Sequence, residues 1–271
     1  MTGYIMESDR EGDRLAAKTE LVLVRRHLDW TGLAAGESFL DAGCGTGIVV
    51  AEAARLIHPG VACGFDASSA RIDDAARQCR QAGLDNVRLY ATPLENFASS
   101  RQHEAGFDHV WTRFFLEYQP DAARTVRTLA RLAKPGGKVT LIDLEGNCTW
   151  HYGMQPALRA GLDEVIGDLA TTGFDPHAGR RLTCYAAQAG LTDIRHEIEP
   201  YHRIVGTPDA RTEAAWVRKI ETIRDAYINR LFPAKSHLRW VFDELVEFLR
   251  SPDTMTWSLL HLVQGTKTRS Q

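Results

Sequence analysis

Short runs of apolar and β-branched residues alternate with helical patterns through the first half of the chain. Five of these runs have the length of strands, at residues 37–41, 61–66, 86–91, 107–112 and 138–143. The helical patterns between them run from Gly47 to Ile57, from Ile72 to the helix-ending glycine Gly83, and from Val126 to Ala133. Strands that alternate with helices predict right-handed crossovers and a mostly parallel sheet covered by helices on both faces.

The second half of the chain is dominated by helical patterns. Apolar residues recur at helical spacing over 158–169 and 182–189, and Asp175-Pro176 supplies the N-cap and first residue of the second helix. A sixth strand follows at 192–201, then helices over 216–231 and 238–249, then a seventh strand at 256–266. Because no further crossover follows it, we expect the seventh strand to pair antiparallel with its neighbour at the edge of the sheet.

These elements predict one α/β domain over residues 1–271, built on a doubly wound, seven-stranded sheet with an antiparallel last strand. Residues 1–35 form an N-terminal helical segment, which a capping box from Ser8 to Glu11 opens. Residues 36–145 form the core. Residues 146–190 and 207–254 form a helical cap, the second part of which is inserted before the last strand.

Composition and charge argue against several classes of protein. The chain has 32 basic and 35 acidic residues and a net charge of -3, which argues against a nucleic-acid binder held by phosphate contacts. No apolar run approaches the length of a membrane span, and the N-terminus is too polar for a signal peptide. The five scattered cysteines form no CxxC pair, so we expect a reduced, cytoplasmic protein without structural zinc.

The sharpest chemical feature is a glycine-rich turn, Phe39-Leu-Asp-Ala-Gly-Cys-Gly-Thr-Gly47, between the first strand and the first helix of the core. Its glycines let the backbone approach a ligand closely, and the helix that follows offers unpaired N–H groups to an anion. Asp66 ends the second strand, where an acidic side chain accepts hydrogen bonds from ribose hydroxyls. The pattern indicates a nucleoside-containing cofactor, and glycine patterns of this kind also serve NAD and FAD.

Three details distinguish this turn: the spacing is GxGxG, Asp41 precedes it, and Lys134-Pro-Gly-Gly137 leads into the fifth strand. With them the sequence resembles the class I S-adenosylmethionine-dependent methyltransferases, strongly from Glu37 to Asp143. From Gly173-Phe-Asp-Pro176 onward it looks like bacterial small-molecule methyltransferases. The resemblance implies a Rossmann-like fold, a single methyltransferase domain, S-adenosylmethionine as cofactor and S-adenosylhomocysteine as product. No metal is expected, because the histidines lack metal-ligand spacing.

The resemblance also implies roles for single residues. Asp66 takes the ribose hydroxyls, Ala67 packs on the adenine, and the carbonyls of Thr112 or Arg113 receive the ammonium of the cofactor. Phe114 faces the methyl group, and Tyr4 folds over the cofactor. The methionine part is surrounded by Asp41, Gly43, Cys44, Gly45 and Gly47.

The end of the third strand departs from the family pattern. Where the family has Gly-Asp-Ala, with the aspartate on the adenine amino group, this chain has Thr92-Pro93-Leu94. Proline lacks both a side-chain acceptor and an N–H. We therefore expect adenine to be read by the backbone N–H of Leu94, with Thr92 or Glu95 assisting.

The acceptor is expected beyond the carboxyl ends of the strands. The fourth strand opens a motif that resembles the family's, Phe107-Asp-His-Val-Trp-Thr-Arg-Phe-Phe-Leu-Glu-Tyr118, here called the fourth-strand motif, and Tyr118 ends it. Trp150, His151 and Tyr152 lie in a loop predicted after the fifth strand. His151 is the first candidate for a general base and Tyr118 the second. The alternative for His151 is a loop histidine that only packs or bonds to backbone. The histidines form no metal-ligand spacing such as HExxH.

Three functions remain open at this point: methyl transfer to an O, N or C atom of a small, partly aromatic or apolar metabolite; methylation of RNA or protein; and non-catalytic use of the cofactor, for example in a cyclisation. The charge balance and the absence of an appended RNA module argue against the second. The expected partner is therefore a small-molecule acceptor, with neither nucleic acid nor membrane, and the oligomeric state is left open.

Overall fold

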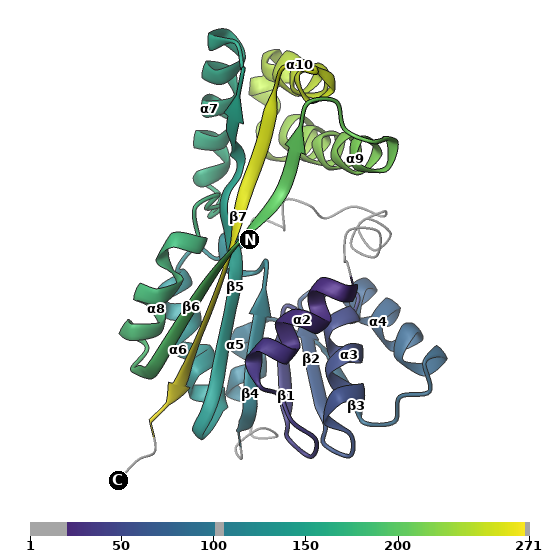
Figure 1. The fold of residues 1–271 in the computed structure, drawn as a ribbon, viewed down its shortest axis with the longest axis vertical. Helices are drawn as coiled ribbons and strands as arrows, with labels where there is room; N and C mark the ends of the chain where they lie inside the picture. Colours follow the sequence, from purple (N-terminus) through teal and green to yellow (C-terminus); the bar gives the residue numbers. More distant parts are fainter. Residues whose placement is uncertain (1–20, 101–105, 269–271) are drawn as a thin grey trace.

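A seven-stranded mixed sheet forms the frame of the protein (Figure 1). The structure, a computed structural model, describes residues 21–100 and 106–268. The strands lie in the order β3-β2-β1-β4-β5-β7-β6, and β7 alone runs antiparallel to both of its neighbours, β5 and β6. Their bounds are β1 Phe39–Ala42, β2 Ala62–Asp66, β3 Val87–Ala91, β4 Phe107–Arg113, β5 Ala133–Tyr152, β6 Leu191–Val205 and β7 Met255–Lys267. The predicted fold class is confirmed.

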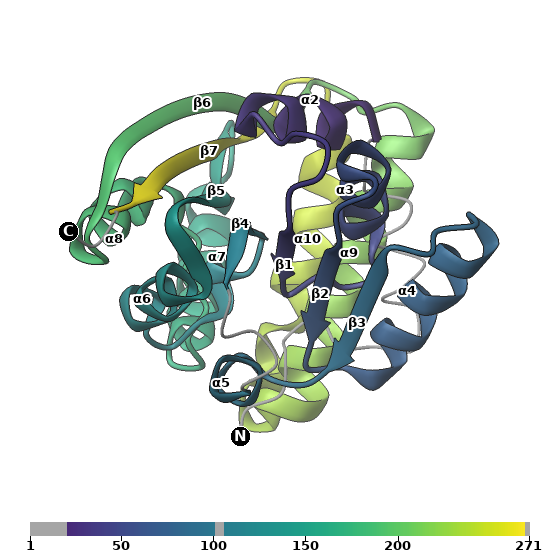
Figure 2. The same ribbon diagram turned by 90° about the horizontal axis from the view of Figure 1, so that it is seen from below.

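Helices cover both faces of this sheet, as the crossover rule requires (Figure 2). On one face, α2 (Leu21–Thr31), α3 (Ile48–Ile57) and α4 (Ser69–Gln81) bury Val24, Val50 and Ile72 in one apolar cluster. On the other, α5 (Leu94–Ser99), α6 (Ala122–Leu132) and α8 (Leu182–Gln188) bury Phe97, Leu129 and Leu182 in a second. The central strands β1 and β2 are buried along their whole length, so their carboxyl ends are held in place by packing on both faces.

A third apolar cluster lies at the other end of the molecule, where long β5, β6 and β7 continue beyond the shorter strands (Figure 1). It is formed by α7 (Pro156–Ala170), α9 (Ala210–Ala226) and α10 (Arg239–Arg250), with Leu162, Ile220 and Leu245 among its buried residues. A π-helical turn, Tyr227–Leu231, and a 3-10 segment, Pro233–Leu238, connect α9 to α10. We call these helices the cap.

The position of the last strand corrects one prediction. β7 lies between β5 and β6, so the edge of the sheet is β6. Residues 260–265 of β7 are all buried, as befits a strand with a neighbour on each side and helices on both faces. The nearly continuous apolar run Leu259-Leu-His-Leu-Val263 carries this signal of an interior strand.

Two local predictions are also corrected. The segment from Glu145 to Tyr152, predicted as a loop, continues β5: after an irregularity its residues 150–152 pair with residues 257–255 of β7. Asp175-Pro176 does not open α8, which begins at Leu182. Asp175 instead accepts a hydrogen bond from the His177 N–H at 3.0 Å, closing a local turn.

The predicted capping box at Ser8 to Glu11 and Tyr4 lie outside the described residues. Over residues 21–100 and 106–268, no helix combines the length and apolarity that crossing a membrane requires.

Candidate functional site

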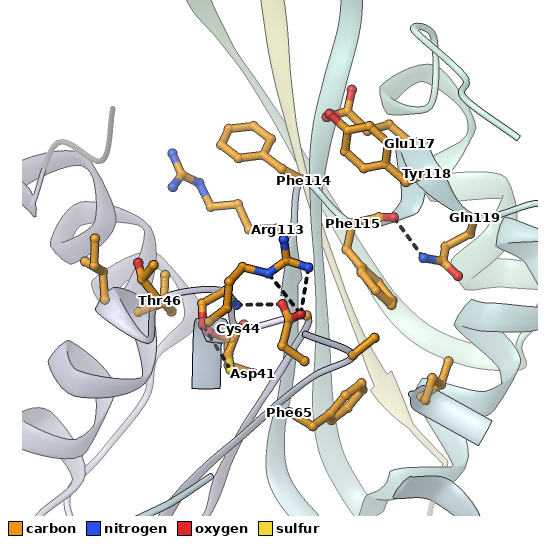
Figure 3. A pocket seen from close by; sticks show the side chains of 18 of the residues that line it. Asp41, Cys44, Thr46, Phe65, Arg113, Phe114, Phe115, Glu117, Tyr118 and Gln119 are labelled. Carbon is orange, nitrogen blue, oxygen red and sulfur yellow. Dashed lines mark hydrogen bonds and ion pairs between the residues drawn. The ribbon is translucent and has the colours of Figure 1, made fainter. Parts of the chain in front are cut away.

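A cavity of about 350 Å³ opens where the carboxyl ends of β1, β2 and β4 meet (Figure 3). Its lining comes from the glycine-rich turn, from the residues after β2, β3 and β4, and from the cap side. Figure 3 shows Asp41, Cys44 and Thr46 on one side of it and Glu117 and Tyr118 on the other. Of the predicted cofactor residues it is lined by Asp41, Gly43, Cys44, Gly45, Asp66, Ala67, Pro93, Leu94, Arg113 and Phe114.

The remaining predicted cofactor residues in the described chain lie next to the cavity but do not line it. Gly47, at the N-terminus of α3, faces Ala75, and a Cβ added there would lie 2.6 Å from the Ala75 methyl group. The Thr92 N–H bonds the carbonyl of Asp66 at 2.9 Å. Thr112 is fully buried, and its hydroxyl bonds the carbonyl of Ala42 at 3.0 Å. These three residues shape the backbone around the cavity.

The glycine-rich turn is fixed by contacts that only glycine permits. Gly43 has a φ of +73°, and a Cβ at this position would lie 2.5 Å from the ring of Phe115. The N–H groups of Gly43 and Cys44 both bond the carbonyl of Phe65 in β2, at 2.9 Å each. The turn therefore lies flat against the ends of β1 and β2 and forms one wall of the cavity.

Asp66 is a fixed acceptor in this wall. Its Oδ2 accepts the N–H of Gly45 at 3.0 Å, and its Oδ1 accepts the N–H of Ser68 at 2.9 Å. Arg71, on the first turn of α4, adds an ion pair to Oδ1, with its Nη2 at 3.0 Å. A carboxylate held by this many donors is fixed in orientation, and it can accept a hydroxyl donor from a ligand.

Asp41 and Arg113 place a buried acid and a buried guanidinium at the neighbouring part of the cavity. Burial, together with the negative charge of Asp66, raises the pKa of Asp41 to about 8. Burial lowers the pKa of Arg113, and the nearby Tyr201 and Asp41 oppose this shift. The Arg113 guanidinium lies 4.3 Å from the ring centroid of Phe114. Within the described chain no group donates a hydrogen bond to the Asp41 carboxyl. A buried acid without a donor beside a buried guanidinium matches a ligand with an ammonium and a carboxylate, such as an amino-acid group.

On the cap side of the cavity two further carboxyl groups are buried together. Asp143 is fully buried and accepts the N–H groups of Leu116, Glu117 and Leu144, at 2.8, 3.1 and 2.9 Å. Burial, with the nearby charge of Glu117, raises its pKa well above the usual range. Asp143 thus holds the short 3-10 turn Leu116–Tyr118, which presents Glu117 and Tyr118 to the cavity.

Glu117 is connected to a lysine of the cap through an asparagine. The Nδ2 of Asn147 donates to Oε2 of Glu117 at 2.7 Å, and the Nζ of Lys219 donates to Oδ1 of Asn147 at 2.9 Å. All three residues are buried and line the cavity, and they come from three separate elements. This chain of hydrogen bonds joins the core to α9.

The structure places the predicted acceptor residues in two different locations. Tyr118 lines the cavity. Trp150, His151 and Tyr152 lie on the outer extension of β5 and are absent from its lining, and Tyr152 is 70% exposed. The His151 ring bonds the Thr256 hydroxyl at 2.8 Å and the Cys148 carbonyl at 3.2 Å, and burial lowers its pKa to about 4. The cavity therefore receives no proton acceptor from His151.

Among the side chains that line the cavity, sequence analysis gave no role to Arg71, Glu117, Asn147, Tyr201 and Lys219, and it gave Arg113 a role only through its backbone carbonyl. The position of Arg71 could have been predicted from sequence, because Arg71 lies in the first turn of the helix that follows β2 and Asp66. Glu117 and Arg113 lie in the fourth-strand motif, where only backbone and ring contacts were expected. Asn147, Tyr201 and Lys219 gave no signal, because β5, β6 and α9 are brought together only by the fold.

Comparison with known proteins identifies the domain. Residues 33–167 match a protein family described as a methyltransferase domain. The chain is 38% identical over 105 residues to the ubiquinone biosynthesis O-methyltransferase of Methylococcus capsulatus, covering 39% of this chain and 42% of that protein. It is 31% identical over 121 residues to the enzyme of the same name from Saccharophagus degradans, covering 45% and 49%. The chain thus spans about half the length of these relatives.

Solved structures share the fold over most of the chain. A [4+2]-cyclase, SpnF, superposes with a TM-score of 0.60 at 19% identity, covering 94% of this chain and 85% of the cyclase. Geranyl diphosphate C-methyltransferase from Streptomyces coelicolor superposes with a TM-score of 0.55 at 17% identity, covering 97% and 85%. At these identities the likeness establishes the fold alone.

Proposed function

From the premise that residues 33–167 are a methyltransferase domain of the class I, S-adenosylmethionine-dependent type, we propose that the protein transfers a methyl group to a small-molecule acceptor. One observation carries the proposal: Asp66, Asp41 and Arg113 line the same cavity, beside the glycine-rich turn. These three side chains match the ribose hydroxyls, the ammonium and the carboxylate of S-adenosylmethionine.

The cofactor residues divide by the part of the ligand that they hold. Asp66 accepts hydrogen bonds from the ribose, and its Oδ2, bonded only to Gly45 among the described residues, has the free lone pair for the first of them. Asp41 and Arg113 bind the zwitterionic end. Pro93 and Leu94 line the cavity where the adenine lies, and the Leu94 N–H, in the unpaired first turn of α5, reads the ring.

When bound, the cofactor supplies a methyl group activated by its sulfonium. The chain has to place the acceptor in line with that group and to exclude water, and such positioning supplies several kcal/mol. Phe114, Phe115 and Tyr118 form an aromatic wall between the turn and the cap that does both. An acceptor hydroxyl or carbon acid also has to lose a proton. The Glu117 carboxylate, buried in the cavity lining, takes that proton, with Tyr118 beside it.

The cap and the cell compartment complete the proposal. The helices over 146–190 and 207–254, with the exception of α8, cover the acceptor side, while residues 36–145 hold the cofactor, within one domain. All five cysteines are free thiols, which fits work in a reducing compartment, the cytoplasm. In the described residues no cluster of His, Cys, Asp or Glu side chains has the geometry to hold a metal ion, and the proposed reaction uses none.

Calorimetric titration with S-adenosylhomocysteine and with NAD tests the cofactor. We expect binding of the first and not of the second. Asp66→Asn keeps the shape of the side chain but removes its charge, and should weaken binding by about 100-fold. Asp74→Asn, on the exposed side of α4, is the matched control and should leave the affinity unchanged. Tight binding of NAD alone would overturn the proposal.

Turnover is tested with methyl-labelled S-adenosylmethionine and panels of small phenols, amines and carboxylic acids. Labelled product with at least one panel, lost in Asp66→Asn, supports methyl transfer. Binding of the cofactor with no labelled product from any panel, RNA or protein fraction would instead assign the cofactor a non-catalytic role.

A further inference from the structure

A second, smaller cavity adjoins the first inside the cap. It measures about 40 Å³, and its walls come from α7, α9 and α10, with Leu162, Val165, Ile220, Phe242 and Leu245 among them. Among the described residues, three line both cavities: Tyr118, Asn147 and Lys219. These three therefore form the partition between an apolar chamber and the place where the methyl group is transferred.

Lys219 is the charged member of this partition. It is only 8% exposed, lies on α9, and its Nζ is 4.7 Å from the ring centroid of Trp216. In the part of the chain that the structure describes, no carboxylate lies within 4.0 Å of its Nζ. Burying an ammonium without a directly paired anion is unfavourable, and lysine is rarely buried unless paired.

The hydrogen bonds around Lys219 leave it able to bind a ligand. An ammonium has three donors, and one of them is used by Asn147 Oδ1 at 2.9 Å. The orientation of Asn147 is fixed, because its Nδ2 bonds Glu117 and its N–H bonds the carbonyl of Pro176 at 3.0 Å. The amide therefore separates Lys219 from the charge of Glu117 and aims the ammonium at the boundary of the two cavities.

We propose that the methyl acceptor is a small carboxylic acid, whose carboxylate binds Lys219 at the partition and whose short apolar end fills the second cavity. One carboxylate oxygen faces Lys219 and the other forms the new bond to the methyl group as the bond from that group to the sulfonium breaks, so the products are a methyl ester and S-adenosylhomocysteine. A buried water needs about 10–15 Å³ of such space, so a cavity of this size takes a group of roughly three or four heavy atoms. The carboxylate supplies the anion that Lys219 lacks, and Asn147 and Tyr118 add polar contacts to it. This inference rests on the proposed function, since it assigns the substrate class of the same site.

The experiment compares acids with their neutral isosteres. The probes are 3-methylbutanoate and butanoate, each against its amide, titrated by ligand-observed NMR into the protein with and without S-adenosylhomocysteine. We expect each acid to bind at least about tenfold more tightly than its amide, a preference typical of a desolvated charge pair. Lys219→Met keeps the length of the side chain and removes the charge, and should abolish the preference. Lys219→Arg should restore most of it.

Lys235→Met is the matched control. Lys235 also lies in the cap, but its Nζ pairs with Glu164 at 2.6 Å on the surface, away from both cavities. This variant should keep the preference for acids. Melting temperatures separate binding from folding: loss of a buried charge should leave Lys219→Met at least as stable as the unmodified protein.

Three outcomes overturn the inference: acids and amides bind equally, neither acid binds in either state, or Lys219→Met retains the preference. A Lys219→Met protein that melts lower while keeping the preference would show that Lys219 only supports Asn147 and Glu117. Binding of S-adenosylhomocysteine is measured in the same samples. If S-adenosylhomocysteine binds but acids are not preferred over amides, this inference alone is refuted. If S-adenosylhomocysteine does not bind, the proposed function is refuted.

Discussion

The guanidinium of Arg71 donates two hydrogen bonds to Oδ1 of Asp66, from Nε at 3.1 Å and from Nη2 at 3.0 Å. The same oxygen accepts the N–H of Ser68, so Oδ1 is saturated, whereas Oδ2 accepts only the N–H of Gly45 from the described residues. A ribose can therefore bond Oδ2 directly, but its second hydroxyl competes with Arg71 for Oδ1.

Removing this competitor should tighten cofactor binding. In Arg71→Met the side chain still packs on α4 but Oδ1 becomes free, so we expect the affinity for S-adenosylhomocysteine to rise by about fivefold, the worth of one net hydrogen bond. Calorimetric titration measures this. Arg77→Met, an exposed position on the same helix, serves as control. A large loss of affinity would mean that Arg71 stays in place and contacts the ligand itself.

Cofactor binding should release a proton from Asp41. In the free protein the pKa of Asp41 is about 8, so the group is protonated at pH 7. An ammonium bound beside it stabilises the carboxylate and lowers that pKa. Titrations of S-adenosylhomocysteine in two buffers of different ionisation enthalpy should show close to one proton released at pH 7. Asp41→Asn should show none, and an equal release from that variant would contradict the assignment.

The same pKa has a consequence for folding. Because the pKa of Asp41 is raised from 3.8 to about 8, the charged form is disfavoured in the folded state. The protein should therefore lose stability as the pH rises through this range, by several kcal/mol in total. Urea unfolding at pH 5 and pH 9 should show a larger loss in the unmodified protein than in Asp41→Asn. A loss of the same size in both proteins would refute this.

His151→Ala should leave turnover within about twofold, because His151 lies outside the cavity and offers no general base. It should instead destabilise the fold by about 1–2 kcal/mol, since the ring bonds Thr256 and Cys148 and packs on Phe248. The pKa of His151 is lowered from 6.5 to about 4, so the unmodified protein should lose stability as the pH falls through that window. Paired rate and unfolding measurements check both effects. A loss of turnover by 100-fold or more would restore His151 as the base.

Glu117→Gln should keep the hydrogen bond to Asn147 while removing the proton acceptor. With a hydroxyl or carbon-acid acceptor we expect turnover to fall by about 10²–10⁴-fold with cofactor affinity unchanged. With an amine acceptor, which reacts as the neutral base, the loss should be small. Single-turnover rates for one substrate of each class distinguish the two, and normal rates with every class would exclude Glu117 as the base.

Pro93→Asp should leave the affinity for S-adenosylhomocysteine unchanged or improve it, because aspartate supplies the acceptor that proline lacks at the cavity wall. Aspartate is also a good N-cap for α5, where Pro93 has no side-chain cap bond, and this offsets the lost rigidity of proline. Stability should therefore stay within about 1 kcal/mol. A marked loss of affinity, measured by the same titration, would show that the backbone made by Pro93 matters more than the side chain aligned there.

The parts of this protein that sequence predicted are those whose signal is local. The turn at Gly43, the strand end at Asp66 and the helical crossovers each follow from residues within one short segment. The glycine-rich turn is predictable because only glycine tolerates a φ of +73° with an aromatic ring 2.5 Å from the missing Cβ.

What sequence left unpredicted depends on contacts between distant segments. Lys219 meets Asn147 across 72 residues, and β5 extends past Glu145 because β7, a hundred residues later, continues to pair with it. Aromatic residues at 150–152 suit such a strand, but they equally suit a binding loop. Pairing with β7 makes residues 150–152 a strand, and nothing within residues 145–152 themselves indicates that partner.

The position of β7 between β5 and β6 has a consequence for biosynthesis. On the ribosome, β6 emerges some fifty residues before the strand that has to separate it from β5. Until residues 255–267 leave the exit tunnel, β5 and β6 each expose an open edge that can pair with the wrong partner. Completion of the sheet is therefore a late event in the folding of a nascent chain, and any nonsense or frameshift mutation before this segment should yield a product that chaperones retain or proteases remove.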